Sequence, residues 1–152
     1  MLRVKPQTYI DTSVWCAFCF NEQEVPGARY WLAQASLDRT ATAVWTRTEF
    51  ASAAALKLRV KGQSPVAVTQ AVRTFEDALV MTHLLEVMAD DFLYAAELCR
   101  TSTTGLRAGD ALHIAVALRR NCKFLASLDK VMNASAQQLG LGLVTFDEIE
   151  SK

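Results

Sequence analysis

The sequence contains no apolar run close to the ~20 residues that a membrane-spanning helix needs. Its first ten residues, MLRVKPQTYI, lack the apolar centre of a secretion signal. These two absences predict a cytoplasmic protein without a membrane partner. Because no repeat or low-complexity linker interrupts the 152 residues, we expect a single domain over residues 1–152.

The chain also lacks an excess of positive charge, because 16 lysines and arginines balance 16 aspartates and glutamates. Proteins that bind nucleic acid non-specifically over a large surface are usually more basic. The balance therefore counts against a broad electrostatic contact with nucleic acid. It leaves room for a small site at which metal ions supply the positive charge.

Nothing in the sequence requires disulfide bonds, because 51% hydrophobic residues can form a core without them. The segment Trp15-Cys16-Ala17-Phe18-Cys19 does resemble the Trp-Cys-x-x-Cys motif of thioredoxin-like oxidoreductases, which is the alternative from another class. The Ala-Phe pair between the cysteines lies in an apolar segment and indicates buried, unreactive thiols. The other two cysteines, Cys99 and Cys122, lack partners at zinc-site spacing.

Short β-like segments alternate with longer helical ones along the chain. We expect strands at 7–10, 42–45, 84–88, 123–127 and 143–146, and helices at 14–20, 28–37, 47–60, from Ser64-Pro65 onward, 90–99 and 110–120. Strands separated by helices favour right-handed crossovers and a mostly parallel sheet. The predicted fold is therefore α/β, a single three-layer α/β/α domain with a mostly parallel central sheet.

Four acidic residues lie where this fold would bring them together. Asp11 and Asp129 each follow a predicted strand, Glu49 lies near the start of the helix after another strand, and Asp110 opens a helix. In open parallel sheets, binding sites form beyond the carboxyl ends of the strands. We therefore expect the four carboxylates to meet in one crevice.

Each acid also has an ordinary explanation at a helix end. Asp11 could cap a helix, Asp110 could interact with a helix dipole, and Asp129 could lie in a turn. Glu49 fits a capping box with Thr46. However, Glu49 and Asp110 both border apolar helical stripes, and carboxylates that point inward need a partner or a cation. A hard divalent cation with oxygen ligands is the expected compensation.

The motifs around these acids resemble, in order, those of PIN-domain proteins, and most of all the VapC-type toxins of prokaryotic toxin–antitoxin pairs. The matching segments are Tyr-Ile-Asp11-Thr12-Ser13, Thr-Glu49-Phe, Leu-Arg-Ala-Gly-Asp110-Ala-Leu-His-Ile-Ala and Leu-Ala-Ser127-Leu-Asp129. The resemblance spans about residues 7 to 146. Ser127 stands where family members often carry threonine, and both residues offer a hydroxyl.

This resemblance implies a PIN-like fold and a ribonuclease that depends on Mg²⁺ or Mn²⁺. Asp11 and Asp110 would be the principal metal ligands and Glu49 and Asp129 would complete the catalytic site, directly or through water. Ser13 would either orient Asp11 or a water molecule, or cap a helix.

His113 lies one helical turn after Asp110. It would contact the substrate, tune the site through the residues that hold the metal, or be an ordinary core histidine. Candidate phosphate contacts, each with surface charge as the alternative, are Arg47, Lys57, Arg107, Arg119 and Arg120.

The resemblance also implies partners: an RNA substrate, a small antitoxin that covers the crevice, and a second copy of the chain in a homodimer. The apolar second and fourth helices could supply such interfaces or serve as internal packing. A non-catalytic PIN-like module that binds RNA or protein is a further alternative. The presence of all four acids gives no reason to infer that activity has been lost.

Overall fold

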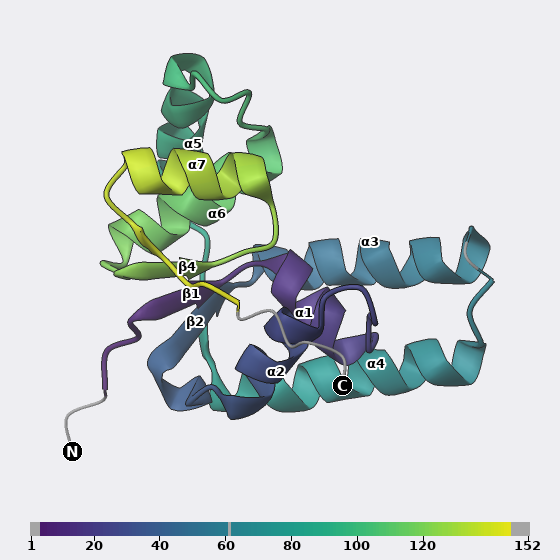
Figure 1. Cartoon of the computed structure of the whole chain (residues 1–152). Coiled ribbons are helices and arrows are strands. Elements are labelled where there is room, and N and C mark those ends of the chain that lie inside the picture. The colour runs from purple at the N-terminus through teal and green to yellow at the C-terminus, as the bar shows by residue number, and fades with distance from the viewer. Residues whose placement is uncertain (1–3, 61, 147–152) are drawn as a thin grey trace.

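A five-stranded sheet, in which every strand pair is parallel, forms the centre of the fold. The structure, a computed structural model, describes residues 4–60 and 62–146 (Figure 1). The strands are β1 (Thr8–Ile10), β2 (Thr40–Ala43), β3 (His83–Leu85), β4 (Phe124–Ala126) and β5 (Gly142–Leu143), in the spatial order β3-β2-β1-β4-β5. The predicted α/β/α fold with a parallel sheet is confirmed.

Helices cover both faces of this sheet (Figure 1). One layer comprises α1 (Thr12–Cys19), α2 (Pro26–Gln34), α3 (Trp45–Arg59) and α4 (Pro65–Met81), with a short 3-10 helix at Leu37–Arg39. The other comprises α5 (Ala89–Thr101), α6 (Ala108–Arg119) and α7 (Lys130–Gln138). Among the described residues, no helix is both long enough and apolar enough to cross a membrane.

The sheet separates two buried apolar clusters, because successive side chains of a strand point to opposite faces. Tyr9 and Leu125 belong to the cluster under α5, α6 and α7, whereas their neighbours Ile10 and Ala126 belong to the cluster under α1 to α4. All four side chains are fully buried. Burial on both faces holds the central strands β1 and β4 rigidly, and these strands carry Asp11 and Asp129 at their carboxyl ends.

Most predicted elements are present with boundaries a few residues from those expected. Helix α4 begins at Pro65, and the Ser64 side chain accepts a hydrogen bond from the backbone N–H of Ala67, as the Ser-Pro pair predicts. Helix α7 is the one the sequence prediction missed. It buries only Met132, Ser135 and Ala136, so its apolar stripe is too weak to stand out from the surrounding polar residues.

Asp91 forms a buried ionic cluster at the start of α5. Its carboxylate accepts hydrogen bonds from Arg119, from Arg120 at 3.1 Å and from the backbone N–H of Met88 at 2.7 Å. The Asp91 side chain is fully buried, whereas that of Asp90 is 73% exposed. The cluster therefore fastens α5 to the C-terminal end of α6.

We predict that Asp91→Ala lowers the free energy of unfolding by about 2 kcal/mol, because it removes the fully buried carboxylate to which two partly exposed guanidinium groups and the Met88 backbone N–H donate. Asp90→Ala is the matched control and should change it by less than about 0.5 kcal/mol. Urea denaturation of both variants measures the difference. Equal stability of the two variants would contradict a structural role for the Asp91 cluster.

Candidate metal centre

Four acidic residues lie at helix starts on the carboxyl side of the sheet. Asp11 directly follows β1 and is the N-cap residue of α1, while Asp129 follows β4 and is the N-cap residue of α7. Asp110 lies in the first turn of α6, and Glu49 is the fifth residue of α3. The topology thus places all four acids at the edge that the sequence predicted.

Asp11 is held by two serines as well as by the helix that it caps. Its Oδ1 accepts hydrogen bonds from the Ser13 hydroxyl at 2.6 Å and the Ser13 backbone N–H at 3.1 Å, and its Oδ2 accepts one from the Ser127 hydroxyl at 2.7 Å. Only 3% of Asp11 is exposed, and burial raises the pKa of its carboxyl group.

The same two serines connect the Asp11 carboxylate to the end of β4. The Ser127 hydroxyl oxygen accepts the backbone N–H of Asp129 at 3.0 Å, and the Ser13 hydroxyl oxygen accepts that of Leu128 at 2.9 Å. Ser13 therefore orients Asp11 and is not the helix cap, a position that Asp11 itself occupies. Both hydroxyls donate to Asp11 and accept from backbone N–H groups of the loop that follows β4. They therefore fix the spacing between Asp11 and Asp129.

Glu49 does not form the capping box that was considered for it. Helix α3 begins at Trp45 without any side-chain cap, and the Glu49 Oε1 instead accepts hydrogen bonds from the Thr12 hydroxyl at 2.7 Å and from His113 Nε2. Burial alone would raise the pKa of Glu49, but the hydrogen bonds from His113 and Thr12 lower it below its ordinary value. The lowered pKa favours the ionised carboxylate of Glu49.

The electrostatics of Asp110 show that the four acids are close enough to interact. Burial, and next the negative charge of Asp129, raise the pKa of Asp110 to about 6, and the charges of Asp11 and Glu49 act in the same direction. Without a positively charged partner, this repulsion disfavours the state in which all four carboxyl groups are ionised. A cation placed among the carboxylates would remove this penalty.

The residues present fit a divalent metal ion. Across residues 4–60 and 62–146, the structure shows no lysine or arginine paired with any of the four acids, and the one basic side chain that contacts any of them is His113, on Glu49. Unpaired carboxylates of this kind match the oxygen ligands that Mg²⁺ and Mn²⁺ prefer.

The carboxylates do not yet converge on one metal position. In the described part of the chain, no three His, Cys, Asp or Glu side chains already surround a common point closely enough to hold a metal. Binding therefore requires some carboxylates to turn inward. Asp110, for which no hydrogen bond is seen among the described residues, is the best placed to turn.

Of the basic residues considered as phosphate contacts, four have other partners. Arg47 pairs with Glu76 at 2.7 Å, and the buried Lys57 pairs with Glu22 at 3.0 Å. Arg119 and Arg120 hold Asp91 at the far end of α6, a rise of about 13 Å along the helix from Asp110. Arg107, the N-cap residue of α6, is exposed three positions before Asp110 and forms no ion pair with another described residue.

The two cysteines of the thioredoxin-like segment lie inside α1 and form no disulfide bond. Burial raises the pKa of Cys16 and that of Cys19 to about 12. A redox cysteine needs a lowered pKa so that the reactive thiolate is present at neutral pH. The structure therefore argues against the oxidoreductase alternative.

We predict that Cys16 and Cys19 resist alkylation in the native protein, at least about tenfold more than in the urea-unfolded chain, because little thiolate forms in the buried state. Peptide mapping after brief iodoacetamide treatment at neutral pH measures the modification of each cysteine. Rapid modification of Cys16 in the native protein would reopen the redox alternative.

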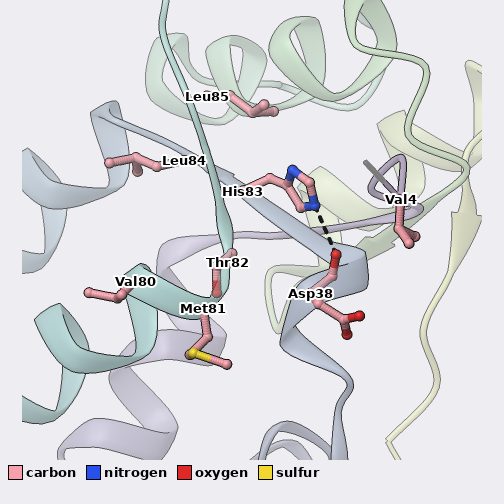
Figure 2. Close-up of a pocket in the computed structure, with 8 residues that line it drawn as sticks. All are labelled: Val4, Asp38, Val80, Met81, Thr82, His83, Leu84 and Leu85. Atoms are coloured by element: carbon pink, nitrogen blue, oxygen red, sulfur yellow. Dashed lines mark hydrogen bonds between the residues drawn. The ribbon is translucent and has the colours of Figure 1, made fainter. Parts of the chain in front are cut away.

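A cavity of about 610 Å³ lies at the opposite edge of the sheet, near the amino ends of β2 and β3 (Figure 2). His83 reaches across it to donate a hydrogen bond from Nε2 to the backbone carbonyl of Asp38 at 2.8 Å. Most of the remaining lining is aliphatic, from Val4, Val80, Met81, Leu84 and Leu85. Because none of the four acids lines this cavity, the candidate chemistry stays at the carboxyl edge.

Comparisons with known proteins identify the fold and the family. The family model for the PIN domain matches residues 8–134. No curated protein matches the chain. Among solved structures, FitAcB from Neisseria gonorrhoeae superimposes with a TM-score of 0.68 at 17% identity, covering 91% of this chain and 97% of that one.

VapC20 from Mycobacterium tuberculosis, described as a toxin that cleaves the sarcin-ricin loop, superimposes with a TM-score of 0.65 at 20% identity, covering 95% of this chain and 100% of that one. A toxin–antitoxin complex from Klebsiella pneumoniae gives a TM-score of 0.64, also at 20% identity, covering 94% and 100%. These likenesses agree in fold with the resemblance that the sequence motifs indicated. Because the family model spans most of its length, the chain belongs to the PIN domain family.

Proposed function

We propose that the protein is a divalent-metal-dependent endoribonuclease that hydrolyses RNA phosphodiester bonds, with Asp11, Glu49, Asp110 and Asp129 as its metal ligands. The observation that carries the proposal is the meeting of four carboxylates at one edge of the sheet, where the structure pairs none of them with lysine or arginine among the described residues. Membership of the PIN domain family supports the same reaction class.

Each acid has a different part in holding the cation, which is Mg²⁺ or Mn²⁺. Asp11 is fixed in place by Ser13 and Ser127, so it supplies the rigid ligand. The negative charge of Asp129 opposes ionisation of Asp110, so these two acids gain most from a shared cation. At this position the four carboxylates would hold a divalent cation, whose chemistry would be to activate water and to neutralise charge on the scissile phosphate.

Arg107 is the side chain that we assign to the substrate. It is exposed at the N-terminus of α6, where backbone N–H groups and the helix dipole also favour a phosphate. Its guanidinium can form paired hydrogen bonds to phosphate oxygens. Arg107 would thus hold the RNA backbone beside Asp110.

We further propose that the protein is the toxin of a type II toxin–antitoxin pair, with a small antitoxin and a second copy of the chain as partners. The support is the likeness in fold to VapC20 and to toxin–antitoxin complexes over nearly the whole chain. The reaction itself needs no 2′-hydroxyl, so the preference for RNA over DNA also rests on this likeness.

RNA cleavage by the purified full-length protein tests the proposal. We expect Mg²⁺ or Mn²⁺ to support cleavage of single-stranded RNA, EDTA to stop it, and Asp11→Ala to abolish it. A DNA strand of the same sequence tests substrate preference. If cleavage continues in EDTA, the metal-centre proposal fails; if RNA binds without any cleavage at saturating Mn²⁺, the chain is a non-catalytic binding module.

A further inference from the structure

Tyr9 and His113 form a buried series of hydrogen bonds that ends at Glu49. Neither residue is a ligand of the proposed metal centre. The Tyr9 hydroxyl, on β1, is 2.6 Å from Nδ1 of His113, on α6, and Nε2 of the same imidazole contacts Oε1 of Glu49, on α3. Tyr9 is 0% exposed and His113 is 1% exposed. Because buried polar groups are costly unless paired, the proton positions along this chain are strongly constrained.

One arrangement of protons satisfies these contacts with a neutral imidazole. In it, the Tyr9 hydroxyl oxygen accepts the backbone N–H of Ala43 at 3.2 Å and donates its own proton to His113. Nδ1 of His113 is then the acceptor. A neutral imidazole that accepts at one nitrogen donates at the other, so the Nε2–H of His113 points to Glu49.

These donors occupy one oxygen of Glu49 and leave the other open. Oε1 accepts from both the Thr12 hydroxyl and His113, whereas no donor to Oε2 is found among the residues that the structure describes. Oε2 faces Gly109, where a Cβ atom would lie only 3.4 Å from it. Gly109 lies in the first turn of α6, which also carries Asp110, so Oε2 faces that turn.

We propose that Tyr9 and His113 are positioning residues, which orient Glu49 so that Oε2 is the oxygen offered to the metal ion. This inference rests on the proposed metal centre and adds the assignment of the ligand atom and of the residues that fix it. His113 acts through Glu49 and has no contact with substrate. Outer partners of this kind typically change metal affinity by about ten- to a hundredfold.

The proton arrangement can be tested without any metal. Long-range ¹H–¹⁵N correlation spectra of the metal-free protein distinguish the two neutral tautomers of a histidine, and we expect His113 to carry its proton on Nε2. Removing the Tyr9 hydroxyl in Tyr9→Phe should allow the Nδ1–H form to appear. An Nδ1–H tautomer in the unmodified protein would overturn the inference.

Metal affinity supplies the second test. Mn²⁺ affinity is measured by calorimetric titration with no other ligand present. Tyr9→Phe should bind Mn²⁺ about tenfold more weakly than the unmodified protein, although Tyr9 does not touch Glu49. Tyr94→Phe, at a half-buried tyrosine on α5, is the matched control and should bind Mn²⁺ as the unmodified protein does. Equal affinity of Tyr9→Phe and Tyr94→Phe would overturn the inference.

Replacement of His113 gives a version of the test that separates positioning from folding. His113→Gln keeps an N–H donor at the length of Nε2, so it should retain more Mn²⁺ affinity than His113→Ala, even where the two unfold at the same urea concentration. If His113→Gln and His113→Ala bind Mn²⁺ equally, positioning by His113 is excluded. If the unmodified protein binds no Mn²⁺ and His113 is the Nε2–H tautomer, the failure lies in the proposed metal centre.

Discussion

Asp110→Asn is expected to abolish RNA cleavage and, in the metal-free protein, to increase stability. The loss of activity should be on the order of a hundred- to a thousandfold, as for removal of a preorganised electrostatic group from an active site. The gain in stability has the same origin. Burial and the charge of Asp129 oppose ionisation of Asp110, so a neutral amide at this position relieves repulsion that the folded chain otherwise bears.

The pH dependence of this gain follows from the pKa values. The ordinary pKa of the Asp110 carboxyl is 3.8 and its pKa in the folded protein is about 6. The folded chain therefore keeps a proton where the unfolded chain has lost it, so the contribution of Asp110 to stability falls as pH rises from about 4 to about 6. Above that window, Asp110→Asn should be more stable than the unmodified protein by about 1 kcal/mol, after discounting for solvent at this half-buried group.

Urea denaturation in EDTA, near pH 4 and near pH 7.5, measures both effects. The two proteins should differ little at the lower pH and clearly at the higher one. Saturating Mn²⁺ should then reverse the order, because a cation that binds only the folded state stabilises the unmodified protein. A variant that is less stable than the unmodified protein at neutral pH in EDTA would show that Asp110 is not repelled by its neighbours.

Asp11→Asn should also abolish cleavage, by a similar factor, but its effect on the fold is different. Asp11 caps α1 through the backbone N–H groups of Ser13 and Val14 and accepts the Ser127 hydroxyl. An asparagine oxygen can still accept the helix hydrogen bonds, whereas alanine cannot. Asp11→Ala should therefore be less stable than Asp11→Asn by about 1 kcal/mol, the usual value of a helix cap.

The comparison of these two variants separates the two roles of Asp11. Both lack the carboxylate, so both should be inactive, and only the alanine variant should lose the cap. Thermal unfolding in EDTA and cleavage assays on the same preparations provide the measurements. Activity in Asp11→Asn near that of the unmodified protein would mean that Asp11 only caps α1.

The sequence was sufficient to predict the α/β/α fold and the edge of the sheet at which the acids lie. That success has a physical reason, because a parallel sheet puts the residues that follow its strands on one side. Asp11 and Asp129 follow β1 and β4, so their placement depends only on the identification of two strands. Helix α7 was missed because it is short and buries only one large apolar side chain, Met132, so its amphipathic pattern rests on few strongly apolar residues.

The sequence offered Ser13 as a residue that orients Asp11, but the partners of Glu49 could not be predicted. Glu49 fitted a capping box with Thr46, yet in the folded chain Thr46 bonds to Thr42 and Glu49 turns to Thr12 and His113. These contacts join residues far apart in sequence, and local spacing carries no information about them. The same holds for the Tyr9 to His113 hydrogen bond, since Tyr9 reads in the sequence as one apolar residue of a strand.

Calorimetric titration of Mn²⁺ into the metal-free protein and into Asp110→Asn tests the central claim most directly. If the four carboxylates form a metal centre, the unmodified protein binds Mn²⁺ saturably and the variant binds it at least about tenfold more weakly. No binding to the unmodified protein, or equal binding to both, would contradict the claim that these acids hold a divalent cation.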